Sequence, residues 1–117
     1  MSAWPEDIHY DSGEKQLHIS FDDGSHYAIP AELLRVESPS AEVQGHSPSQ
    51  KQIVPGKADV TITDIEAVGN YAIRLTFSDG HNSGIYTWNY LAELGADKEA
   101  KLNAYYEALK TKGLGRN

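Results

Sequence analysis

The strongest constraint on the fold is a pattern that occurs twice: an apolar alternation, an Asp-Gly turn, a second alternation and a helical segment. Apolar residues at 17, 19 and 21 precede Asp23-Gly24, and a shift of 56 positions places the same pattern at 73, 75 and 77 before Asp79-Gly80. After the turn the shift is 58, so the second copy has two more residues there. A period of two gives a strand one buried face, and glycine accepts the positive φ of a hairpin turn. The sequence therefore predicts two strand–turn–strand–helix units.

Two such units predict an α+β fold, in which a small antiparallel sheet is covered by helices packed on one face. Strands are expected over the apolar alternations, at 8–10, 17–21, 25–29, 60–62, 65–68, 71–77 and 85–86. Pro30 is tolerated in a first helical turn and predicts a helix over 31–35, while Thr87 predicts the cap of a helix over 88–94. A last, amphipathic helix is expected at about 97–112.

The chain of 117 residues fits a single domain, 1–117, with a core that needs no disulfide or metal. Its composition shifts to Ser, Pro, Gln, Gly and Lys over 37–59, between the two units. Loops longer than ~12–15 residues inside compact domains are usually functional or mobile. We interpret 37–59 either as a lid over a site or as a disordered excursion, and its composition favours the second.

Composition excludes several kinds of chemistry. Cysteine is absent, which rules out disulfides, thiolate metal sites and cysteine nucleophiles. The formal net charge is −7, with 17 acidic and 10 basic residues, so nucleic acid is not an expected partner. No apolar run approaches the ~20 residues of a membrane span, and residues 1–7 lack the features of a signal peptide. We therefore expect a cytoplasmic protein without a membrane partner.

Several short motifs carry a family resemblance. They are Leu34-Arg35, SPSAEVQGH at 38–46, VGNYA at 68–72 and DGHNSGIY at 79–86, with Trp88 and Leu91. Together they resemble the gamma-butyrobetaine hydroxylase-like N-terminal domain, a domain of unknown function, over about 7–95. Because it lacks cysteine, the chain resembles the cysteine-free, stand-alone bacterial branch of that family.

The resemblance implies an accessory module rather than an enzyme. In the hydroxylases the domain precedes an iron- and 2-oxoglutarate-dependent oxygenase, and elsewhere it is fused to iron–sulfur cluster carrier ATPases. The family's zinc is held by a Cys-Pro-Cys-x-x-Cys segment and a distant histidine, which the resemblance places at Ser38, Ser40, Val43 and His81. Three of these four residues are poor ligands or none, so the zinc of the family is not expected and no cofactor is predicted.

The candidate ligand- or partner-binding residues lie in or around the polar turn at 79–86, and they are Arg35, His46, Asn70, Asp79, His81, Ser83 and Tyr86. His81 beside Asp79 predicts an imidazole–carboxylate pair, which orients a ring nitrogen for proton transfer or metal binding, although a structural hydrogen bond is the commoner role. With His46 these two residues are weak candidates for a metal site. Arg35 is either an anion clamp or half of an ion pair.

The remaining candidates have simpler interpretations. Gly69-Asn70 favours a tight turn or a bulge, and Tyr86 favours core packing over a stacking platform. His9, His18 and His26 fall on or near strands and are expected to face solvent, with no assigned role.

No complete catalytic constellation is present, so the sequence predicts a protein that is not an enzyme. The leading hypothesis is a non-catalytic binding or protein-interaction module whose surface joins the Asp79–Tyr86 turn, Arg35 and the long loop around His46. The expected partner is another protein. The alternative is a metal-binding or iron–sulfur cluster assembly accessory protein.

Overall fold

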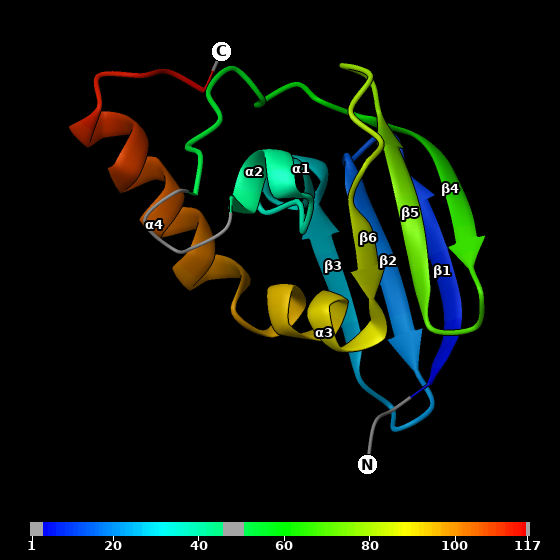
Figure 1. The fold of residues 1–117 in the computed structure, drawn as a ribbon. Coiled ribbons are helices and arrows are strands. Elements are labelled where there is room, and N and C mark those ends of the chain that lie inside the picture. Colours follow the sequence, from blue (N-terminus) through cyan, green and yellow to red (C-terminus); the bar gives the residue numbers. More distant parts are fainter. Residues whose placement is uncertain (1–3, 46–50, 117) are drawn as a thin grey trace.

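The computed structural model describes residues 4–45 and 51–116, and it divides their strands between two three-stranded antiparallel sheets (Figure 1). The α+β prediction is confirmed, with the refinement that each repeated unit builds its own sheet. Within the described ranges, no helix combines the length and the hydropathy that crossing a membrane would need.

The first sheet has the order β1 (Pro5–Asp11), β2 (Gln16–Phe21) and β3 (His26–Pro30), and it leads into helix α1 (Ala31–Val36). The apolar residues of the central strand β2 are buried and alternate with partly exposed polar ones, which is the pattern of a strand with one core face.

The second sheet repeats this plan with β4 (Ile62–Val68), β5 (Ala72–Phe77) and β6 (Ile85–Thr87), followed by helix α3 (Trp88–Ala96). Thr87 caps α3, because its hydroxyl accepts a hydrogen bond from the backbone N–H of Tyr90 at 3.2 Å. Of the separately expected strand at 60–62, only Ile62 lies in a strand, as the first residue of β4; Val60 and Thr61 precede it without strand structure. The register of β4 is irregular between Ile62 and Asp64.

Hydrogen bonds in the two Asp-Gly turns confirm the repeat. Gly24 donates its N–H to the carbonyl of Phe21 at 3.1 Å, and Gly80 donates to Phe77 at 2.9 Å. Both glycines have positive φ, 88° and 91°, which most other residues adopt only with strain. The two units are thus alike in backbone geometry as well as in pattern.

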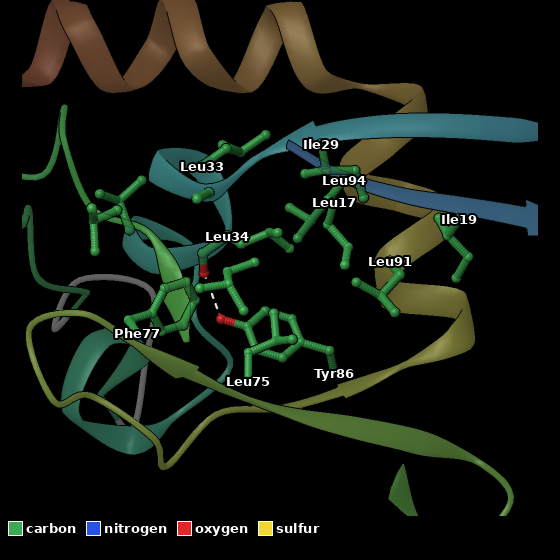
Figure 2. Close-up of a cluster of buried hydrophobic side chains, with 14 of the residues drawn as sticks. Leu17, Ile19, Ile29, Leu33, Leu34, Leu75, Phe77, Tyr86, Leu91 and Leu94 are labelled. Atoms are coloured by element: carbon green, nitrogen blue, oxygen red, sulfur yellow. Dashed lines mark hydrogen bonds between the residues drawn. The ribbon is translucent and has the colours of Figure 1, made fainter. Parts of the chain in front are cut away.

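One hydrophobic core lies between the sheets and the helices. Figure 2 shows the side chains of Leu17 and Ile19 from β2 and of Leu75 and Phe77 from β5 converging on one cluster. Helix α4 (Lys98–Thr111) contacts α1 and α3 and buries Tyr105 in the same core. The helices lie on one side of the strands, as predicted (Figure 1).

The described part of the 37–59 segment is held against the domain. It contains a short helix, α2 (Ala41–Gln44), whose Val43 is buried. Gln52 donates its N–H to the carbonyl of Val43 at 2.7 Å, and the Tyr105 hydroxyl donates to the carbonyl of Val54 at 2.5 Å. The predicted excursion is therefore an ordered connection in its described residues; the candidate His46 lies outside them.

Candidate functional site

The site forms where the turn between β5 and β6 meets the chain that leaves α1. Asp79 of the turn accepts hydrogen bonds from Arg35 Nε at 2.8 Å and from Lys57 Nζ at 2.6 Å, both at Oδ2. Its Oδ1 accepts the backbone N–H of His81 at 3.1 Å. Burial raises the pKa of the Asp79 carboxyl, but the hydrogen bonds from Lys57, His81 and Arg35 outweigh burial and hold that pKa well below its ordinary value. Asp79 is therefore an ionised anchor.

The side chain of His81 contacts the segment that follows α1. Its Nε2 lies 2.9 Å from Ser38 Oγ and 3.4 Å from Ser40 Oγ, and its Nδ1 lies 3.2 Å from Glu42 Oε2. The prediction that the His81 ring pairs with Asp79 is wrong: the carboxylate beside the ring is that of Glu42, and Asp79 accepts only the backbone N–H of His81.

The protonation of His81 follows from these surroundings. Its side chain is 7% exposed, and burial together with the nearby Arg35 guanidinium lowers the pKa of the imidazole against the opposing charges of Glu42 and Asp79. A neutral imidazole has one N–H, and the Glu42 carboxylate beside Nδ1 favours that nitrogen as its position, which leaves Nε2 as an acceptor beside the hydroxyls of Ser38 and Ser40.

Glu42 links the segment after α1 to the turn between β5 and β6. Ser83 of the turn donates its hydroxyl to Glu42 Oε2 at 2.8 Å, so this carboxylate contacts two turn residues at once. Sequence reasoning did not single out Glu42 or Lys57, because both lie in the segment interpreted as a loop. The close approach also explains Gly84: a Cβ at that position would lie 2.4 Å from Ser38 Oγ.

The other predicted site residues have structural roles. Tyr86 is fully buried and donates its hydroxyl to the carbonyl of Leu34 at 2.5 Å, which agrees with core packing and removes it from any binding surface. Burial raises the pKa of this hydroxyl well above its ordinary value, so it keeps its proton. Asn70 lies beyond the opposite end of β5 and accepts a hydrogen bond from Trp88 Nε1 at 3.0 Å through its carbonyl.

Asn70 is therefore not part of the cluster. The six residues of β5 separate it from the turn by about 20 Å of extended chain. Arg35 does belong to the cluster, but as half of an ion pair: its side chain is only 12% exposed. Its Nη1 is buried and has no hydrogen-bond partner within the described part of the chain.

The donor set does not fit the zinc that the resemblance implies. Ser38 and Ser40 offer hydroxyl groups, Val43 offers no donor atom, and only His81 is a good ligand. The side chains of Ser38, His81 and Glu42 are arranged in series, but they do not provide an accessible nucleophile. Ser38 is fully buried, and a substrate has no route to its Oγ.

Comparisons with known proteins agree with the resemblance. Two proteins with NMR solution structures are 39% and 37% identical to this chain, with TM-scores of 0.85 and 0.86. The first match covers 100% of this chain and 92% of the other, and the second covers 98% and 86%.

A crystal structure from Acidithiobacillus ferrooxidans ATCC 23270, of a protein with unknown function in the DUF971 family, is 39% identical, with a TM-score of 0.67. That match covers 79% of this chain and 92% of the other. The search of curated proteins found no match. The family description "Gamma-butyrobetaine hydroxylase-like, N-terminal" matches residues 8–92. The chain therefore belongs to the gamma-butyrobetaine hydroxylase-like N-terminal family.

Proposed function

We propose that this chain is a non-catalytic binding module that recognises another protein through the exposed rim of the turn between β5 and β6. The observation that carries the proposal is that the turn is fixed from two sides. Asp79 is held by Arg35 and Lys57, while His81 and Ser83 are held through Glu42. A loop fixed in this way loses little conformational entropy when it binds, which favours affinity.

The rim of this turn has the mixed character of a recognition surface. Asn82 and Ser83 are exposed polar residues, and the adjacent Ile85 is 42% exposed although it belongs to strand β6. On the outer face of the sheet, Ile85 lies opposite Arg74, which forms an ion pair with Glu66 at 2.6 Å. An apolar side chain surrounded by fixed polar groups matches the anatomy of a small protein interface.

The same contacts argue against catalysis. A catalytic acid, base or nucleophile must reach its substrate. Here the Asp79 carboxylate is occupied by two cations, both ring nitrogens of His81 face internal partners, and the Ser38 hydroxyl is buried. These groups hold the turn in place. The iron–sulfur accessory role that the resemblance implied has no separate support at this site.

The test compares two exposed apolar residues that differ in position. Ile85 is 42% exposed beside the turn, and Leu114 is 39% exposed beyond the end of α4. A photo-crosslinking residue placed at Asn82 would be used with the wild-type chain, with Ile85→Ser and with Leu114→Ser in lysate from the native host.

We expect a specific cross-linked protein with the wild-type chain and with Leu114→Ser, and its loss with Ile85→Ser. Thermal unfolding of all three chains controls for folding. A cross-linking pattern that Ile85→Ser leaves unchanged, or that Leu114→Ser abolishes equally, would contradict the proposed surface.

A further inference from the structure

Three histidines form a row on the outer face of the first sheet, away from the site described above. His9 of β1 pairs directly with His18 of β2, and His26 of β3 pairs with the neighbouring Ser20. The rings of His9 and His18 are stacked, with centroids 5.0 Å apart and an interplanar angle of 7°. The His18 and His26 centroids are 5.4 Å apart. The burial of alternate residues in β2 places His18 on the solvent face, as the sequence predicted.

Two carboxylates meet this row at the hairpin between β1 and β2. Asp11 ends β1, Glu14 lies in the connecting turn, and His18 lies two residues into β2. One donor atom from each of these three side chains can be chosen so that all three lie within 4.8 Å of one another. Glu14 Oε1 is 3.5 Å from His18 Nε2.

These separations suit a shared cation. Ligand atoms at ~2.0–2.2 Å from a metal ion with a near-tetrahedral angle between them are about 3.4 Å apart. The distance between Glu14 and His18 is within about 0.1 Å of that value. The remaining separations are within 4.8 Å, so side-chain rotation of Asp11 and of the exposed Glu14 would bring the three donors around one ion.

The orientation of the His18 ring is already fixed by its neighbours. Its Nδ1 lies 3.3 Å from His26 Nε2, and His26 Nδ1 lies 2.9 Å from Ser20 Oγ. A metal-binding imidazole typically donates its second ring N–H to such a partner, which leaves the other nitrogen free as a ligand. Here that free nitrogen is His18 Nε2, the one that faces Glu14. The stacked ring of His9 further restricts the plane of His18.

Hydrogen bonds also orient the carboxylate of Asp11. Its Oδ1 accepts the backbone N–H groups of Gly13 at 2.9 Å and Glu14 at 3.0 Å, which leaves Oδ2 available. Lys15 of the same turn forms its ion pair with Asp59, at 3.3 Å. The described ion pairs provide no Lys or Arg partner for Asp11 or Glu14, so the negative charge of the pair is available to a cation.

We propose that Asp11, Glu14 and His18 Nε2 bind one divalent transition-metal ion of the zinc class on the outer face of the first sheet. The mixed imidazole and carboxylate donors favour Zn²⁺ over Mg²⁺, which prefers oxygen ligands alone. Water completes the coordination, because the hairpin is open to solvent. This inference is independent of the proposed protein-binding surface, which lies on the second sheet.

The test is a titration of the full chain with Zn²⁺ by isothermal titration calorimetry in a non-coordinating buffer at neutral pH. We expect one equivalent to bind with a micromolar dissociation constant. His18→Gln and Glu14→Gln should each weaken binding by about tenfold or more. Two matched controls, His81→Gln in the other site and the exposed Glu107→Gln on α4, should leave the dissociation constant unchanged.

NMR spectra of the imidazole groups identify the ligand directly. Sub-stoichiometric Zn²⁺ should shift the resonances of His18 before those of His81. Binding only at millimolar concentration would overturn the assignment. So would a dissociation constant that His18→Gln leaves unchanged, or a loss of binding in His81→Gln. Circular dichroism of each variant confirms that a change in affinity does not come from unfolding.

Discussion

The contact between Gly84 and Ser38 allows a quantitative test of how the turn is packed. An alanine at position 84 would place its Cβ 2.4 Å from Ser38 Oγ and 3.2 Å from both Pro39 Cδ and Tyr86 Cε1. The first distance is far inside the ~3.5 Å at which non-bonded heavy atoms attract one another. Ser38 is fully buried and holds His81 Nε2 at 2.9 Å, so it cannot move without losing that hydrogen bond.

The expected cost of Gly84→Ala has two parts. Overpacking a well-packed interior costs about 1–3 kcal/mol, and leaving a buried polar group such as His81 Nε2 without its hydrogen-bond partner costs a further ~1–3 kcal/mol. Because the chain can relax in part, we expect a loss of roughly 2–4 kcal/mol in the free energy of unfolding. For a domain of this size that loss lowers the melting temperature by roughly 8–15 °C.

A double-mutant cycle isolates the contact. Ser38→Ala removes the oxygen that collides with the new methyl group, so Gly84→Ala should cost about 1–2 kcal/mol less in that background than in the wild type. Urea denaturation followed by tryptophan fluorescence gives all four free energies of unfolding. Equal costs of Gly84→Ala in the two backgrounds would refute the predicted collision with Ser38.

Three further predictions concern the groups around this contact. The pKa of Asp79 is lower in the folded state than in the unfolded state, so the ionised carboxylate stabilises the fold. This contribution to the free energy of unfolding is complete above the unfolded pKa of ~3.9 and is lost as the pH falls through the folded pKa. The urea midpoint of the wild type should therefore fall more steeply below about pH 5 than that of Asp79→Asn, and parallel curves would contradict the ion-pair network. Tyr86→Phe leaves a buried carbonyl without its donor and should cost about 1–3 kcal/mol, whereas Tyr71→Phe, at an exposed position, should be neutral by the same urea assay. Another variant carries cysteine at the three positions that the resemblance aligns with the zinc ligands, namely Ser38, Ser40 and Val43. Elemental analysis should find one zinc per chain in this variant and less when His81→Ala is added; equal zinc contents would show that His81 is not a ligand.

The strands and turns of this protein could be predicted because they depend on local sequence. Strand β2 is recognisable from the alternation of Leu17, Ile19 and Phe21, since a period of two gives a strand one apolar face wherever it lies. Gly24 and Gly80 mark turns because the required positive φ is a property of a single residue. The repeat of these signals gave the order of the elements and the α+β class.

The candidate site could be predicted only in part. His81 and Asp79 were recognisable as polar groups on one turn, but their side-chain partners lie far away in sequence: Glu42 is 39 positions from His81, and Lys57 is 22 from Asp79. No local pattern identifies such partners, because their positions depend on how the 37–59 segment crosses the domain. The burial of Tyr86 likewise depends on the packing of its β-strand against α1.

By itself, the sequence determined most of the strands, turns and helices, because backbone preferences and the period of apolar residues act over a few neighbouring positions; it did not reveal the short helix α2, which lies in the segment interpreted as a loop. Tertiary structure alone decided that the strands form two sheets, that Glu42 rather than Asp79 faces the His81 ring, and that Asn70 lies apart. These outcomes depend on contacts between distant segments. Such contacts form where the whole chain buries the most apolar surface while its buried polar groups keep hydrogen-bond partners.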